Sequence, residues 1–112
     1  KKIRDKAFAN NLFKNAKLLY TDNSVEVHLN KPVAFNSIQL KEKISLGQKV
    51  VKFELSGGND LKQFQPIAKG TTIGHKRILQ FPTQNIQYIR IHFTEYKAKP
   101  ILTDISGYLI SN

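Results

Sequence analysis

Three histidines are the residues of this sequence that could most readily act as a base or bind a metal. His28 and His92 lie in alternating strand-like patterns, and His75 follows a glycine at a turn. No two of them have the spacing of a zinc pair, and the sequence contains no cysteine. We therefore interpret His28 and His92 as surface histidines and predict no metal site. His75 stays open between a surface and a functional role, because it stands at a loop–strand junction beside two basic residues.

The acidic and hydroxyl side chains follow no pattern that is typical of a catalytic centre. The 8 Asp and Glu residues are scattered, whereas glycoside hydrolysis requires two carboxylates at a fixed separation across a cleft. No Gly-x-Ser-x-Gly elbow and no phosphate-binding glycine loop occurs. The sequence therefore predicts that this chain is not an enzyme by itself, and it indicates no cofactor.

Polar side chains in three predicted loops form the most coherent candidate site. Converging at one end of a rigid sandwich, such donors and acceptors would suit the hydroxyl groups of a sugar. An aromatic ring among them would give a pyranose an apolar surface to stack on. The predicted carbohydrate-binding residues are Glu42, His75, Arg77, Tyr96, Lys97 and Lys99, with Tyr96 as the stacking ring. The alternative interpretation is that these are solvated loop charges.

Short segments of alternating hydrophobicity cover most of the chain and predict about seven strands with almost no helix. The expected turns are Asn30-Lys31-Pro32, the hairpin Gly57-Gly58-Asn59-Asp60, and a strand end at Pro82. We expect the first and last strands to pair and Gly107 to form a bulge. The predicted strands are residues 24–29, 35–42, 49–56, 64–69, 76–81, 88–93 and 101–110. This pattern predicts an all-β, antiparallel β-sandwich.

The first 17 residues differ from the rest of the chain. Ile3, Ala7, Phe8 and Leu12 have the spacing of one face of a short helix that ends near Asn11. We therefore divide the chain into a lead-in, residues 1–17, which connects to something upstream, and a sandwich domain, residues 18–112.

The net charge of +10 is dominated by lysine, since only three of the 18 basic residues are arginine. Specific nucleic-acid recognition favours arginine for its bidentate fork, so nucleic acid is not a favoured partner. No apolar stretch is long enough to cross a membrane, and we expect a soluble domain without an address signal of its own.

Four segments resemble the C-terminal β-sandwich of bacterial and plant α-L-fucosidases, which are family 29 glycoside hydrolases. They are residues 40–50, 67–82, 89–91 and 99–105, and the most specific is Gly70-Thr71-Thr72-Ile73-Gly74-His75-Lys76-Arg77. The resemblance runs from about Val25 to Ile110. The lead-in resembles the linker between the catalytic barrel and the sandwich of that family. The family's sandwich is similar to the factor V/VIII type C, or discoidin-like, domain with the galactose-binding jelly-roll fold.

The resemblance implies that the parent protein is a secreted or periplasmic retaining fucosidase whose catalytic residues lie on an upstream (β/α)₈ barrel. Related family 32 carbohydrate-binding modules bind galactose-type sugars through loops at one end. Members usually carry an Asp-Gly-Asp-x-x-Thr-Tyr-Trp segment that holds a structural calcium, but this chain lacks it and has no tryptophan. We therefore expect no calcium site here.

Three functions follow from these observations. The first is a non-catalytic accessory domain of an α-L-fucosidase that recognises a fucosylated or galactosylated glycan. The second is a purely structural domain that supports the barrel, in which Ile3, Phe8 and Leu12 would contact the rest of the protein. The third is an electrostatic binder of sulfated glycans or nucleic acid, suggested by the net charge.

Overall fold

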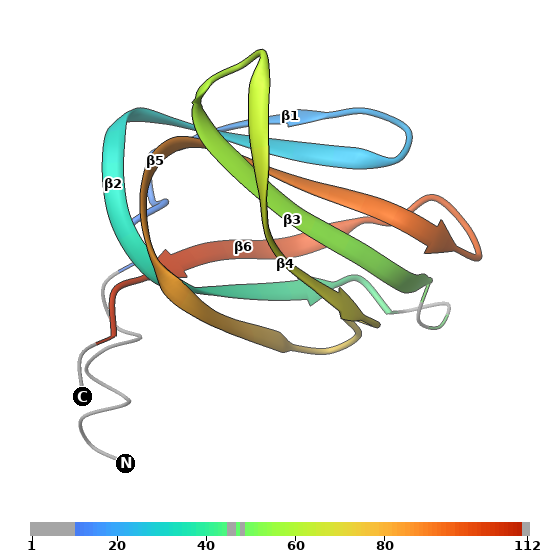
Figure 1. Cartoon of the computed structure of the whole chain (residues 1–112). Helices are drawn as coiled ribbons and strands as arrows, with labels where there is room; N and C mark the ends of the chain where they lie inside the picture. The colour runs from blue at the N-terminus through green and yellow to red at the C-terminus, as the bar shows by residue number, and fades with distance from the viewer. Residues whose placement is uncertain (1–10, 45–46, 48, 111–112) are drawn as a thin grey trace.

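The computed structural model describes residues 11–44, 47 and 49–110, and in these residues the chain is all-β and antiparallel, as predicted (Figure 1). No helix long and apolar enough to cross a membrane occurs in this described part. The strands are β1 (Lys17–Tyr20), β2 (Ser24–Glu42), β3 (Val50–Asp60), β4 (Gln63–Thr71), β5 (Arg77–Tyr96) and β6 (Leu102–Tyr108).

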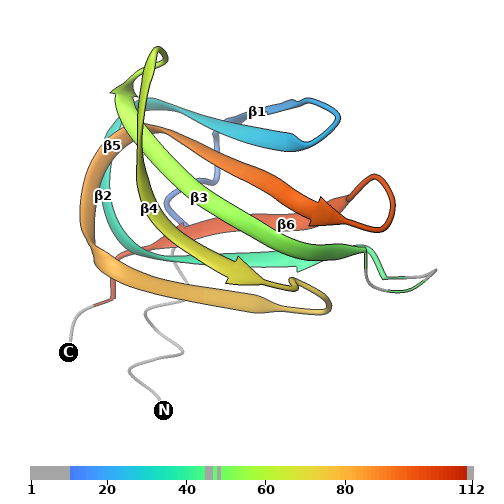
Figure 2. The ribbon, with the colours of Figure 1, turned by 45° about the vertical axis from the view of Figure 1, so that its right-hand side comes forward.

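Two long strands, β2 and β5, each bend and contribute to both layers of the fold (Figures 1 and 2). In one layer, the first half of β2 pairs with β1 and with the second half of β5, which in turn pairs with β3, and β3 pairs with β4. In the other layer, the second half of β2 pairs with β6 and with the first half of β5. The result is a sandwich-like arrangement in which β2 and β5 pass from one layer to the other side by side.

The bends of β2 and β5 replace two of the predicted turns. The prediction of a turn at Asn30-Lys31-Pro32 is wrong, because β2 runs through it; the pairing with β5 merely shifts between His28 and Val33. The prediction that Pro82 ends its strand is wrong for the same reason: β5 continues, and its pairing shifts between Gln80 and Gln84. Proline has no N–H to donate to a ladder, so it is tolerated where pairing lapses at a bulge.

The predicted hairpin is present, but its turn lies further along the chain than predicted. β3 continues to Asp60, and the register pairs Asp60 with Gln63, which leaves Leu61 and Lys62 as the turn. The Asp60 carboxylate accepts the backbone N–H of Lys62 at 2.9 Å. An aspartate that accepts the N–H two residues ahead stabilises a tight turn without glycine in it.

The core comes from the inward side chains of the strands. Val25, Val27 and Leu29 are buried as the alternation predicted. In β3 the alternation predicts Val51, Phe53 and Leu55 on one face and Val50 on the other. Phe53 and Leu55 are both buried, but Val50 is fully buried and Val51 only partly. The pairing with β5 shifts between Val50 and Lys52, and such an irregularity changes which face a side chain takes.

The first predicted strand, residues 24–29, does not pair with the last, contrary to expectation. Residues 24–29 form the first half of β2, which pairs with β1 and β5, whereas β6 pairs with residues 37–42 in the second half of β2. Gly107 is not a bulge either, since it pairs in regular register with Ile38. A Cβ atom at Gly107 would lie only 2.4 Å from the ring of Phe13, so glycine is required here for the close approach of an aromatic side chain.

The predicted helix falls mainly on residues 1–10, which lie outside the described residues. The described part of the lead-in, residues 11–16, forms turns rather than a helix. This segment lies beside β6 in space. Leu12 donates its N–H to the carbonyl of Gly107 at 2.8 Å, and the Asn11 side-chain oxygen accepts the N–H of Gly107 at 3.0 Å. Phe13 is only 4% exposed and packs edge-on against Phe35. The lead-in therefore contributes an aromatic side chain to the core, while the proposed domain boundary stays a prediction.

The contact between Phe13 and Gly107 predicts the effect of a single methyl group. Gly107→Ala should lower the free energy of unfolding by about 1–3 kcal/mol, because the added Cβ would overlap the ring. Urea denaturation measures this loss. The double variant Gly107→Ala/Phe13→Leu should lose less free energy of unfolding than the two single variants lose together, because the smaller side chain leaves room for the added methyl group. The control, Thr103→Ala on the exposed side of β6, should change the free energy of unfolding little.

Candidate functional site

Four connecting segments gather at one end of the fold; their described residues are 21–23, 43, 44, 47, 49, 72–76 and 97–101 (Figures 1 and 2). Backbone hydrogen bonds join them to neighbouring segments. Lys43 donates its N–H to the carbonyl of Ile101, and Lys97 donates to Lys49, both at 2.8 Å. The loops that carry the predicted site residues therefore lie side by side, while the site itself stays a prediction.

Glu42 is the residue around which this end is organised. It is only 3% exposed. One carboxylate oxygen accepts the backbone N–H groups of Lys49 at 2.8 Å and Val50 at 2.9 Å, and the other accepts the N–H of Gly74 at 3.1 Å. The Glu42 N–H itself donates to the carbonyl of Gly74 at 2.9 Å. The carboxylate therefore holds two loops through their backbones and is directed away from solvent.

Gly74 of the most specific motif belongs to the Glu42 clamp, which is the buried carboxylate with the three backbone N–H groups that it accepts, and Thr72 shapes the same loop. Gly74 has a φ of 61°, a left-handed conformation that places its N–H and carbonyl toward Glu42. Thr72 also has a positive φ, 43°, which is rare for a β-branched residue. Its N–H donates to the carbonyl of Val51 at 3.0 Å, and the next residue, Ile73, is buried. The motif thus specifies a loop shape, and His75 is the exposed side chain that follows it.

Arg77 and Tyr96 lie at the ends of β5, on either side of this region. Arg77 pairs with Leu40 and is partly buried, and its Nε has no hydrogen-bond partner among the described residues. Tyr96 pairs with Val50 and leaves 38% of its surface exposed.

Lys97 and Lys99 are exposed on the following loop, which also exposes Ile101. Of the six predicted site residues, four therefore have exposed surface at the loop end, Arg77 is half-buried, and Glu42 is directed inward. A role for Glu42 in touching a sugar stays a prediction, and the structure gives it a positioning role instead.

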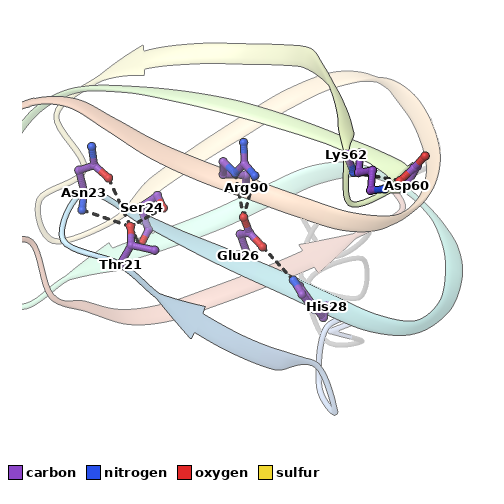
Figure 3. A network of polar contacts seen from close by, with 8 residues as sticks. All are labelled: Thr21, Asn23, Ser24, Glu26, His28, Asp60, Lys62 and Arg90. Atoms are coloured by element: carbon purple, nitrogen blue, oxygen red, sulfur yellow. Dashed lines mark hydrogen bonds and ion pairs between the residues drawn. The ribbon is translucent and has the colours of Figure 1, made fainter.

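A second polar cluster lies away from the loop end (Figure 3). It is on the solvent side of the layer that contains β1, the first half of β2, the second half of β5, β3 and β4. We call this side the outer face. Glu26 accepts a hydrogen bond from Arg90 at 2.9 Å and lies 3.0 Å from Nε2 of His28. Burial acts to raise the pKa of Glu26, but hydrogen bonds from His28 and Arg90 and their charges outweigh it, so the pKa is lowered. Thr21, Asn23 and Ser24 form hydrogen bonds beside it.

Sequence reasoning missed this cluster, although its signal was present. The alternation placed Glu26 and His28 on one face of their strand and Arg90 and His92 on one face of another. Only the pairing of Glu26 with Arg90 across β2 and β5 brings the two sets together.

No protein-family model matches the chain. A curated relative, "Putative alpha-L-fucosidase 1" of Oryza sativa subsp. japonica, is 39% identical over 75 residues, which are 67% of this chain and 14% of the relative. A glycoside hydrolase 29 family member from an unknown rumen bacterium has a structure with a TM-score of 0.88 and 30% identity, covering 99% of this chain and 21% of that one.

A second similar structure is that of CpGH89CBM32-5 from Clostridium perfringens, in complex with GalNAc-β-1,3-galactose. It has a TM-score of 0.67 and 17% identity over 76% of this chain and 64% of that chain, so it shows a common fold alone. The chain thus spans about a fifth or less of the rice and rumen proteins, and it is similar to a small part of glycoside hydrolases related to α-L-fucosidases.

The clamp predicts a specific defect when its charge is removed. Glu42→Gln keeps the shape but turns an amide group toward backbone N–H donors, so the free energy of unfolding should fall by about 1.5–3 kcal/mol. Hydrogen exchange of the amides of Lys49, Val50 and Gly74 should accelerate more than that of the core strands. Uniform acceleration throughout the sandwich would contradict a local clamp. Glu54→Gln, on an exposed residue of β3, serves as the control.

The lowered pKa of Glu26 predicts a pH-dependent contribution to stability. Because the pKa is lower in the folded state than its ordinary value of 4.5, ionised Glu26 stabilises the fold above that value. This contribution should disappear as the pH falls through the folded-state pKa. The unfolding free energies of the wild type and Glu26→Gln should therefore differ at about pH 6 and converge as the pH falls below 4.5 and through the lowered pKa. A constant difference would contradict the assignment. Glu95→Gln removes only an exposed 3.7 Å ion pair and is the control.

Proposed function

We propose that this chain is the C-terminal, discoidin-like β-sandwich of an α-L-fucosidase, and that it is a non-catalytic domain that recognises a glycan. The single observation that carries the proposal is the agreement of sequence and structure with glycoside hydrolases over most of this chain and only a fifth or less of theirs. The catalytic residues then belong to a (β/α)₈ barrel in the same polypeptide. A secreted or periplasmic location follows from the same assignment.

The likeness to CpGH89CBM32-5 supports the galactose-binding jelly-roll type and a carbohydrate ligand, since that protein is in complex with GalNAc-β-1,3-galactose. We place the glycan at the loop end, where His75, Tyr96, Lys97 and Lys99 are exposed together. Tyr96 would stack on a sugar ring while the basic side chains donate to its hydroxyls. Arg77 has an unused donor in the same region, and Glu42 keeps the loops in place.

A purely structural role is the second candidate, and a different observation favours it. Strand β1 is an edge strand with all four residues exposed, among them Leu18, Leu19 and Tyr20. Exposed apolar residues on an edge strand are typical of a surface that another domain covers. In this case the chain alone would bind no glycan, and deleting it from the full-length protein would lower the stability of the barrel.

The third candidate, electrostatic binding of sulfated glycans or nucleic acid, is favoured by the basic side chains of the loop end. None of the ion pairs among the described residues neutralises Lys43, Lys76, Lys97 or Lys99. Such binding would weaken steeply as salt is raised, because it depends on counterion release.

Glycan binding by the loop end predicts a set of loss-of-binding variants. We expect Kd values of about 1 mM for fucose- or galactose-terminated glycans, and His75→Ala, Arg77→Ala and Tyr96→Ala should each weaken binding about tenfold or more. NMR titration at physiological and raised salt measures this, with Lys31→Ala, an exposed residue of the bend in β2, as the control.

Unchanged binding in the three loop variants would remove these assignments. Binding to sulfated glycans alone, lost in salt, would favour the electrostatic candidate. Absence of binding would favour the structural one.

A further inference from the structure

An open cleft of about 430 Å³ lies on the outer face between β3 and β4, away from the loop end. Its side chains include Glu54 and Ser56 of β3 and Phe64, Pro66 and Lys69 of β4. This volume lies within the range of small-ligand sites. No described element covers the outer face of β3 and β4 (Figures 1 and 2). The cleft is therefore open to a ligand in this structure.

The aromatic ring at this cleft, that of Phe64, contacts the side chain of Arg90. The guanidinium of Arg90 lies 4.1 Å from the centroid of the Phe64 ring, and Arg90 is itself held by Glu26 at 2.8 Å. A cation over one ring face is favourable and fixes the orientation of the ring. Phe64 is only partly buried and lines the cleft. A ring fixed in this way can offer its edge and remaining surface to an apolar patch of a ligand at little entropic cost.

Three polar side chains at the cleft, those of Glu54, Ser56 and Lys69, form no hydrogen bond or ion pair with any described residue. Glu54 and Lys69 are direct partners across β3 and β4, yet no ion pair joins them. Within the described part of the chain, no side-chain hydrogen bond uses Glu54, Ser56 or Lys69. A ligand hydroxyl can donate to a carboxylate and accept from an ammonium group at once, so a polyhydroxyl ligand would satisfy both.

The charges around the cleft balance, in contrast to the chain as a whole. Glu26 and Glu54 offset Arg90 and Lys69 on the outer face, whereas the chain carries a net charge of +10. A polyanion would gain little from a balanced surface. The combination of an aromatic ring, free donors and acceptors and local neutrality points to a neutral carbohydrate.

The cleft also continues along the strands. A second cleft of about 430 Å³ shares Glu54 and Lys69 with the first and extends to Gly70, Thr71 and Thr94. Two adjoining clefts along one strand pair can accept successive sugar units. We propose that the outer face of β3 and β4 is a second binding site, for a neutral oligosaccharide that lies along the two strands. This inference goes beyond the loop-end site and does not require it.

The test maps binding on the ¹⁵N-labelled chain by NMR, with lactose, 2′-fucosyllactose and lacto-N-tetraose as neutral probes. Concentrations reach roughly ten times a millimolar Kd. The expected result is a set of shifts at residues 54–56 and 64–71 that persists at raised salt and in Tyr96→Ala, with the tetrasaccharide binding most tightly. Phe64→Ala and Phe64→Leu should each weaken this binding at least tenfold, and Glu54→Gln several-fold. Phe64→Leu keeps the apolar side chain in case the alanine variant unfolds.

Two matched controls separate the cleft from the general surface. Lys62→Ala changes an exposed lysine of the β3–β4 turn, and Lys31→Ala an exposed lysine of the bend in β2, and both should leave the Kd unchanged. Shifts confined to residues 72–76 and 96–99 would overturn the outer-face site while supporting the loop end. Shifts at neither place with any probe would overturn both, and wild-type affinity in Phe64→Leu would overturn the role of the ring.

Discussion

The buried carboxylate of Glu42 is the interaction on which the loop end of this domain depends. It accepts three backbone N–H groups from the two loops that precede β3 and β5. Backbone donors at a buried position must find partners, and these loops have few alternatives because they cross between strands of different layers. One side chain therefore fixes where Val50 begins β3 and where Gly74 turns the chain into β5. The exposed side chains that follow, His75 and Tyr96 among them, take their places from that framework.

The all-β class could be predicted from the alternation of apolar and polar residues. Val25, Val27 and Leu29, for example, occupy every second position and are all buried. The strand ends could not be predicted in this way. Pro32 and Pro82 resemble turn signals, yet each lies where β2 or β5 bends between layers and the pairing shifts. A local sequence cannot distinguish a turn from a bulge, since both tolerate a missing N–H; only the partner strand decides. For the same reason the role of Gly107 depends on Phe13, which lies far away in sequence.

For the candidate site, the sequence indicated where the residues lie better than what each residue does. Sequence reasoning grouped six residues as one site, and backbone hydrogen bonds join the loops at the end where they lie. It did not anticipate that Glu42 is turned inward, because a glutamate that follows a strand is usually solvated. The Gly70–Arg77 motif was the best indicator of resemblance, and its Gly74 is explained by the clamp. The cluster of Glu26, Arg90 and Phe64 combines three strands, so no local pattern could reveal it.

The loop end and the outer face of β3 and β4 differ in how their charges are distributed. At the loop end, no ion pair among the described residues uses the exposed Lys43, Lys76, Lys97 or Lys99, so any attraction there has a long-range component that salt screens over a Debye length of about 8–10 Å. On the outer face Arg90 is paired with Glu26 and Lys69 lies opposite Glu54, so these charges partly cancel beyond contact distance. What remains there is short-range: stacking on Phe64 and hydrogen bonds to Glu54 and Lys69. Salt therefore weakens only the electrostatic part of any attraction at the loop end, whereas the proposed binding on the outer face depends on shape and on direct contact.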